Sequence, residues 1–187
     1  MRKIVIYPDK ALRRKCALVK NWGKAERKVV ADLKRVLAKS KIGVGLSAPQ
    51  IGARSRVFII KREQEFVVFV NPVIKKSFGS RTYPLVVLPK GQAEEFMEGC
   101  LSFPDLYGPV KRFLKIKVSY QEPPKMKNEK FKMKNKILED LPAIIFQHEK
   151  DHLDGILFID HLKAEKRDLF KIDTKGNKTK ANLESLC

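Results

Sequence analysis

The chain of 187 residues is long enough for one domain with a substantial hydrophobic core, and its 40 Lys and Arg against 21 Asp and Glu give a formal net charge of +19. No apolar run is long enough to cross a bilayer as a helix, and three cysteines do not make a disulfide framework. The composition argues against a helical membrane protein and a disulfide-stapled secreted domain, and we expect a cytoplasmic protein.

The first part of the chain predicts a strand, a helix and a glycine-rich loop. Arg2–Pro8 has the character of a first strand, which leaves no room for a cleaved targeting segment. In Glu26–Lys41, apolar residues recur at three- and four-residue spacing, the pattern of an amphipathic helix. The loop Gly43–Gly52 lets backbone approach a ligand closely, and Gln50 offers an amide donor. The lysine and hydroxyl of a phosphate-binding loop are missing.

Short apolar or alternating runs predict strands further along the chain. They are Val57–Ile60, Phe66–Val70 and Phe113–Tyr120. Lys130–Lys134 alternates lysine with apolar residues, so we expect it to form the second arm of a hairpin with one solvated face.

A cysteine in mid-chain has an unusual context. Cys100 stands in the run Glu98-Gly99-Cys100-Leu101-Ser102, and Pro104 follows. Gly99 permits backbone shapes that other residues resist, and the proline ends regular structure, so the thiol could be aimed at a site. The alternative is a small buried apolar residue, as most free cysteines are. The segment alone leaves both roles open.

The most informative segment is His-Glu-x-x-His, formed by His148, Glu149 and His152 within an apolar stretch. On a helix the two histidines are separated by ~6 Å of rise and ~40° of rotation, so both imidazoles can face one metal ion. Glu149 would sit beside them, free to handle the proton of a water. We expect Asp140 to cap this helix and Pro142 to lie in its opening turn.

A catalytic centre of this kind normally takes three protein ligands, and two are given by the helix. In one metalloprotease class the third is a histidine further along the same segment, but that position holds Phe158, which cannot bind a metal. His161 would need an unusual turn to reach back. Acidic residues and the three cysteines, Cys16, Cys100 and Cys187, stay open as candidates.

Three segments in this order resemble the signature motifs of the peptide deformylase family. The family's Gly-x-Gly-Leu-Ala-Ala-Pro-Gln corresponds to Gly43–Gln50, with Ser47 in place of the first alanine. Its Glu-Gly-Cys-Leu-Ser and Gln-His-Glu-x-Asp-His-Leu-x-Gly match Glu98–Ser102 and Gln147–Gly155 without a change. The resemblance spans roughly Ile4 to Leu162, and jointly the motifs are very specific.

The resemblance implies a metal-dependent hydrolase that removes the formyl group from the N-terminal formylmethionine of nascent polypeptides and releases formate. It assigns Cys100, His148 and His152 as metal ligands. We expect Fe²⁺ as the native metal, with Zn²⁺, Ni²⁺ or Co²⁺ able to substitute. The implied fold class is α+β, with antiparallel sheets and a β-hairpin packed around a central helix that carries the histidines.

The resemblance also implies the catalytic roles. A hydroxide on the metal is the nucleophile, and Glu149 acts as general base and then as general acid. The Gln50 side chain and the backbone N–H of Leu101 stabilise the oxyanion. The family pairs an acid with an arginine at the positions of Glu98 and Arg112, which would brace the cysteine segment.

An apolar slot for the methionine side chain is expected from the positions that form it in the family. They are Val44, Gly45, Leu141, Ile144 and Ile145. Without the resemblance, these residues would be interpreted as ordinary core.

Three features depart from the family pattern. Ser47 replaces an alanine of similar size, so little change is expected there. Tyr107 stands where many relatives carry an arginine at the mouth of the cleft, and this could alter contacts with the peptide. Ser77–Glu95 is longer than its usual counterpart and could reshape the substrate entrance.

We expect a catalytic domain over residues 1–165 and a basic, partly disordered tail over 166–187. The tail could meet the ribosome surface or its RNA, because excess positive charge attracts polyanions. A solvated lysine-rich surface is an equally good interpretation. N-formylmethionyl peptides are the expected partners, and a membrane or DNA is not. The rival functions are a metal-dependent endopeptidase and an RNA-binding protein that keeps the scaffold without activity.

Overall fold

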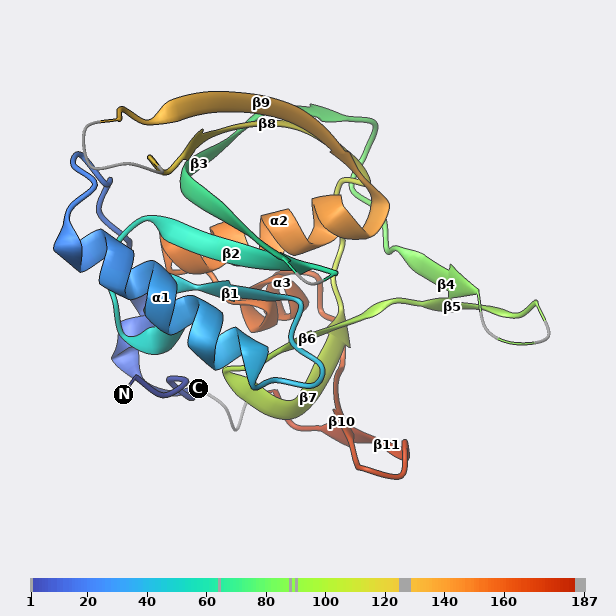
Figure 1. The fold of residues 1–187 in the computed structure, drawn as a ribbon. Coiled ribbons are helices and arrows are strands. Elements are labelled where there is room, and N and C mark those ends of the chain that lie inside the picture. The colour runs from blue at the N-terminus through green and yellow to red at the C-terminus, as the bar shows by residue number, and fades with distance from the viewer. Residues whose placement is uncertain (1, 64, 88, 90, 125–128, 184–187) are drawn as a thin grey trace.

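The computed structural model describes residues 2–63, 65–87, 89, 91–124 and 129–183 (Figure 1). Within them lie three α-helices: α1 (Lys24–Ala38), α2 (Asp140–Asp154) and α3 (Phe158–Ala164). Two short 3-10 helices are η1 (Lys10–Arg13) and η2 (Ala48–Ile51). All sheets are antiparallel, so the expected α+β fold with antiparallel sheets is confirmed.

The largest sheet has the strand order β1-β2-β3-β8-β9. Its strands are β1 (Gly45–Ser47), β2 (Val57–Arg62), β3 (Glu65–Phe78), β8 (Lys115–Glu122) and β9 (Lys132–Glu139). The long strand β3 pairs with β2 through its first half and with β8 through its second, across register shifts that bend it. The β8–β9 hairpin is the one predicted, although its second arm begins two residues later than expected and runs five residues further.

A second sheet has the order β11-β10-β7-β6, and a separate two-stranded ribbon projects from the body of the molecule (Figure 1). The sheet is built from β6 (Met97–Cys100), β7 (Phe103–Pro109), β10 (Leu169–Ile172) and β11 (Lys178–Ala181). The ribbon consists of β4 (Leu85–Val87) and β5 (Ala93–Glu95). It lies in the segment that was expected to be longer than its family counterpart.

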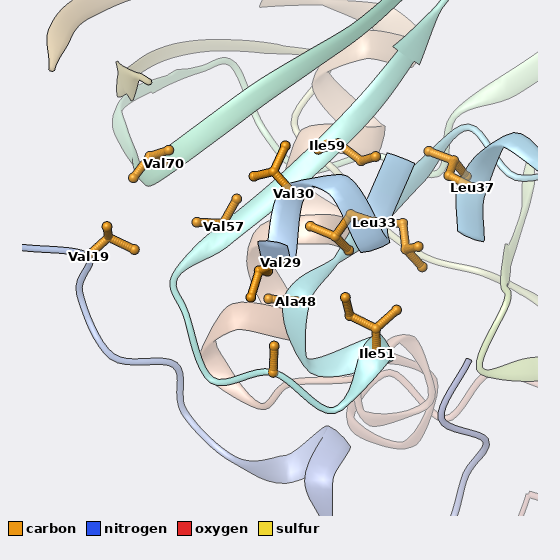
Figure 2. Close-up of a cluster of buried hydrophobic side chains, with 12 residues drawn as sticks. Val19, Val29, Val30, Leu33, Leu37, Ala48, Ile51, Val57, Ile59 and Val70 are labelled. Atoms are coloured by element: carbon orange, nitrogen blue, oxygen red, sulfur yellow. The ribbon is translucent and has the colours of Figure 1, made fainter. Parts of the chain in front are cut away.

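Helix α1 covers the outer face of β1 and β2. Its buried residues follow the predicted helical spacing, and Figure 2 shows Val29, Val30 and Leu33 grouped with Val57 and Ile59 of β2. The backbone N–H of Gly23 donates to the Glu26 carboxylate at 3.0 Å, which satisfies one donor at the helix start. The helix begins two residues before the predicted range and ends three before its predicted end.

Helix α2 packs on the opposite face of this sheet, where an aromatic cluster holds it. The ring of Phe146 lies edge-on to Phe58 and Phe69, with centroids 5.2 and 5.4 Å away. Gly155 ends the helix in the left-handed conformation, at φ 75°. Phe146 lies between the start of the helix and His148, and its ring faces the sheet. This aromatic packing therefore fixes the rotation of the helix about its axis.

The N-terminal segment is not the strand that was predicted. The Val5 N–H donates to the Gln50 carbonyl at 2.8 Å, and the Tyr7 N–H donates to the Ser102 carbonyl at 3.0 Å. The two acceptors belong to different segments, so no ladder forms, even though the residue pattern is that of a strand.

The predicted cap of α2 is also one residue off. The structure caps the helix at Glu139, without a side-chain cap bond, and Asp140 is its first residue at φ 51°. Strand pairing continues up to Glu139, and the Asp140 N–H still donates to the Leu114 carbonyl at 2.7 Å. The helix therefore starts where the ladder stops. Pro142 lies in the first turn, as predicted.

The expected basic tail contains a β-hairpin in the part that the structure describes, and the expectation of partial disorder stays a prediction. There β10 pairs with both β7 and β11, and Leu169 is buried. Gly176 and Asn177 lie in the turn of this hairpin, with Gly176 at φ 85°. Residues 184–187 of the predicted tail lie outside the described residues, and the domain boundary at 165 stays a prediction.

Candidate metal centre

The side chains of Cys100, His148 and His152 converge although they come from different parts of the chain. Their ligand atoms all lie within 4.8 Å of one another, and the Cys100 Sγ is 3.2 Å from the His152 Nε2. Cys100 ends β6, and both histidines project from one face of α2 with ring centroids 4.9 Å apart. Among the described candidates for a third ligand, Cys100 is the residue that the structure brings next to the two histidines.

The cysteine segment is held by a tight contact with the neighbouring strand. Gly99 pairs with Tyr107 of β7, and a Cβ on Gly99 would lie 2.5 Å from the ring of Tyr107. Glycine is therefore required next to Cys100, and the Tyr107 ring covers it. The register shifts between Gly99 and Cys100, which turns the thiol out of the ladder.

A buried network of charges braces both halves of the centre. Arg112 donates to the two carboxylate oxygens of Glu98 at 3.0 and 2.9 Å, and to Asp151 at 2.5 Å. Burial acts to raise the pKa of Glu98, but Arg112 and His148 outweigh it and lower the pKa to about 2. The expected Glu98–Arg112 pair is thus present. No pattern in the sequence indicates that Asp151 joins this pair, or that the His161 Nε2 lies 2.9 Å from Asp151.

The two histidines have opposite electrostatic surroundings. Burial acts to lower the pKa of His148, but hydrogen bonds with Cys100 and Glu98 raise it well above its ordinary value. Burial and the charge of His148 lower the pKa of His152. The Nδ1 of His148 is 3.6 Å from Glu98, so its other ring nitrogen is directed to the thiol.

Gln50 lies on η2, and its side chain approaches the thiol of Cys100. It is 1% exposed, and its Oε1 accepts from the Ser47 backbone N–H at 2.9 Å and from the Ser47 hydroxyl at 2.8 Å. Its Nε2 is directed at the Cys100 Sγ and the Ser102 Oγ, both 3.4 Å away. Since both contacts are long, the amide N–H groups could turn to a ligand beside the thiol.

Glu149 is buried against β1, next to the two histidines. A Cβ on Gly45 would lie 2.5 Å from the Glu149 Oε1, so this close approach requires glycine. Burial raises the pKa of Glu149 to about 7, although the charge of His148 and a hydrogen bond with Ser47 act in the other direction. A carboxyl group with this pKa can accept and release a proton near neutral pH.

The donor set fits a divalent transition metal. One thiol sulfur and two imidazole nitrogens are ligands that such ions take, and three ligands leave a position open. Among the described residues, the Glu149 Oε2 is a buried atom without a hydrogen-bond partner. A buried carboxylate oxygen is seldom left so, and a water or substrate in the site would satisfy it.

The five residues expected to line the methionine slot lie on β1 and α2 or next to them, and these two elements pack together. Val44 and Leu141 are about half exposed, at 47% and 46%. Gly45 and Ile144 are buried, and Ile145 is partly so. Because exposed apolar side chains border buried ones here, the arrangement suits a slot open to solvent, and its role stays a prediction.

The long segment between β3 and β6 is anchored at its base. The Tyr83 hydroxyl donates to Glu165 at 2.9 Å, and the Arg167 guanidinium lies 4.4 Å from the centre of the Tyr83 ring. The Arg81 Nη2 is 3.4 Å from the His161 Nδ1, which connects the segment to the buried charge network. Beyond these contacts the ribbon β4–β5 projects away from α2 (Figure 1).

Known proteins give an independent comparison. The family model described as polypeptide deformylase matches residues 1–168, ending where β10 begins. The peptide deformylase of Desulfotalea psychrophila is 37% identical over 179 residues, covering 92% of this chain and 94% of that protein. That of Aquifex aeolicus is 36% identical over 173 residues, covering 89% and 90%.

Solved structures agree with the sequence relatives. The crystal structure of peptide deformylase from Thermotoga maritima has a TM-score of 0.70 and 30% identity, covering 86% of this chain and 97% of that one. The structure from Legionella pneumophila has a TM-score of 0.71 and 33% identity, covering 87% and 86%. The motifs, the converging side chains and these likenesses lead to one conclusion: this chain belongs to the peptide deformylase family.

Proposed function

We propose that this protein removes the formyl group from the N-terminal formylmethionine of nascent polypeptides and releases formate. The observation that carries the proposal is the meeting of Cys100, His148 and His152, with Glu149 and Gln50 on either side of them. Family membership supports the same reaction. The thiol must stay reduced to serve as a ligand, which suits a reducing cytoplasm as the place of action.

Cys100, His148 and His152 would hold the metal that this family of metalloenzymes uses. When bound, a divalent ion supplies Lewis acidity, which lowers the pKa of water and polarises a carbonyl. We assign Fe²⁺ as the native ion, with Zn²⁺, Ni²⁺ and Co²⁺ as substitutes. The mixed sulfur and nitrogen donor set supports this group of ions, and geometry and availability would select among them.

Glu149 moves the proton in the proposed reaction. Its unpartnered Oε2 would accept a proton from the attacking water, and the same carboxyl group would then donate to the departing amine. Gln50 and the Leu101 backbone N–H would donate to the oxyanion that forms on the formyl carbonyl. Val44, Gly45, Leu141, Ile144 and Ile145 would take the methionine side chain, which places the formyl carbon beside Glu149.

We assign these roles to residues 1–165 and a separate one to the basic residues that follow. The hairpin β10–β11 carries exposed lysines, namely Lys171, Lys175, Lys178 and Lys180. Positive charge on a projecting hairpin would attract ribosomal RNA, close to where formylated chains emerge. RNA binding is therefore proposed as an accompaniment to catalysis.

Formate release is the decisive measurement. The protein would be purified without oxygen, loaded with Fe²⁺ and given an N-formyl-Met peptide, with the unformylated peptide in parallel. We expect formate from the wild type and the Lys150→Ala control, whose side chain lies on α2 outside the centre, and almost none from Glu149→Ala. No formate from the wild type would reject the function. An active Glu149→Ala variant would reject the proton role, and internal cleavage of the unformylated peptide would favour the endopeptidase.

A further inference from the structure

Ser47 makes contacts that an alanine of similar size would not. It ends β1, is 0% exposed and immediately precedes η2, the short helix that carries Gln50. Its hydroxyl donates to the Gln50 Oε1 at 2.8 Å, next to the bond from its own backbone N–H. The expectation that serine in place of alanine changes little depends on the similar size of the two side chains. It does not take the hydroxyl into account.

The Glu149 carboxyl group lies nearby, against Gly45 two residues earlier in β1. The Ser47 hydroxyl has one hydrogen to donate, and in the structure it donates this hydrogen to the Gln50 Oε1. The Ser47 side chain therefore acts on the amide that would face the oxyanion in the proposed reaction.

The backbone bond and the hydroxyl bond restrain Gln50 in different ways. The Ser47 N–H can only donate, so it decides which end of the amide is oxygen and directs the Nε2 at Cys100. A single bond still allows the amide to swing about it. The hydroxyl adds a second bond to the same oxygen and so limits that swing. A preorganised donor stabilises developing charge better than one that must be reoriented during the reaction.

We propose that Ser47 is a positioning residue that holds the Gln50 amide in its productive orientation through its side-chain hydroxyl. This role rests on the proposed deformylase function, in which Gln50 donates to the oxyanion. Ser47 does not itself need to touch the substrate, so its effect should be seen in turnover rather than in binding.

The test is a double-mutant cycle on the Zn²⁺-loaded and Fe²⁺-loaded proteins. Ser47→Ala is expected to lower kcat about fivefold, the size of one neutral hydrogen bond, with KM changed less than about twofold. In a Gln50→Ala background, the same substitution should leave the residual kcat unchanged. Ser119→Ala, another buried serine, located in β8, is the matched control and should match the wild type.

A second measurement needs no turnover. In ¹H–¹⁵N spectra of the Zn²⁺-loaded protein, the side-chain NH₂ signals of Gln50 should be resolved in the wild type and shifted or broadened in Ser47→Ala, with equal metal content in both. An unchanged kcat, an equal fall in the Gln50→Ala background, or unchanged Gln50 signals would each overturn the proposal. If the wild type releases no formate, the deformylase function fails by itself, and the spectra still decide whether Ser47 orients Gln50.

Discussion

At the scale of single residues, the centre depends on a close approach between Glu149 and β1. Its carboxyl group can lie beside β1 only because the strand presents a glycine, Gly45, to it. The small residue at this position thus has two effects, since it makes room for the Glu149 side chain and limits where that side chain can lie. Substitutions that preserve polarity but add volume should be the most damaging.

Gly45→Ala tests this directly. A Cβ would lie 2.5 Å from the Glu149 Oε1, so the carboxyl group must shift. Because a displacement of ~1 Å at a catalytic group can cost ~10²-fold in rate, we expect a loss of that order in kcat with metal content retained. Formate release and metal analysis check the two parts. Gly23→Ala, where the nearest atom is the end of the Glu26 side chain, is the control, and equal activity of the two variants would contradict the argument.

At the scale of elements, the end of α2 is as important as its middle. The helix stops at Gly155, whose N–H donates to the His152 carbonyl at 3.2 Å, and the following chain turns against the N-terminal segment. The Cys16 N–H donates to the Leu153 carbonyl at 2.8 Å there. The helix that presents both histidines is therefore anchored at its C-terminus by backbone contacts with residues near the start of the chain.

Gly155→Ala and Gly176→Ala form a matched pair of substitutions. Both glycines have positive φ, 75° and 85°, which costs an L-residue roughly 1–2 kcal/mol. Around Gly176 nothing lies within 4 Å, whereas a Cβ at Gly155 would overlap the carbonyl oxygen of Arg13. Overpacking adds about 1–3 kcal/mol, so Gly155→Ala should lower the free energy of unfolding clearly more than Gly176→Ala. Urea unfolding monitored by circular dichroism measures both, and equal losses would mean that the contact with Arg13 yields easily.

At the scale of the whole molecule, the catalytic body and the added basic surface are distinguishable. The family match ends at residue 168, and β10 and β11 extend the smaller sheet beyond it. No helix in the described part of the chain is long and apolar enough to span a membrane. The net charge of +19 is distributed over this body and its hairpins. Polyanion binding can therefore be tested apart from catalysis by replacing lysines on one hairpin.

Replacing the four hairpin lysines 171, 175, 178 and 180 by glutamine should weaken binding to ribosomal RNA and leave formate release from short peptides unchanged. Each phosphate contact contributes ~0.7–0.9 to the slope of log K against log salt concentration, so the slope should fall by up to about 3–4. A variant with Lys117, Lys132, Lys134 and Lys136 of β8–β9 replaced removes the same charge elsewhere. Equal slopes for both variants would indicate a diffuse effect of net charge instead of a hairpin site.

The sequence by itself determined the amphipathic helix α1, the β8–β9 hairpin, the helix carrying His148 and His152, and, through family motifs, the candidate ligands. These depend on spacing within one element, where neighbouring residues set the geometry. Only the tertiary structure decided that Cys100 meets the histidines, that Asp151 contacts His161, that the Ser47 hydroxyl bonds Gln50, and that Phe170 and Lys171 pair with β7. Such contacts join segments far apart in the chain, and their energies depend on burial and register that no local pattern encodes.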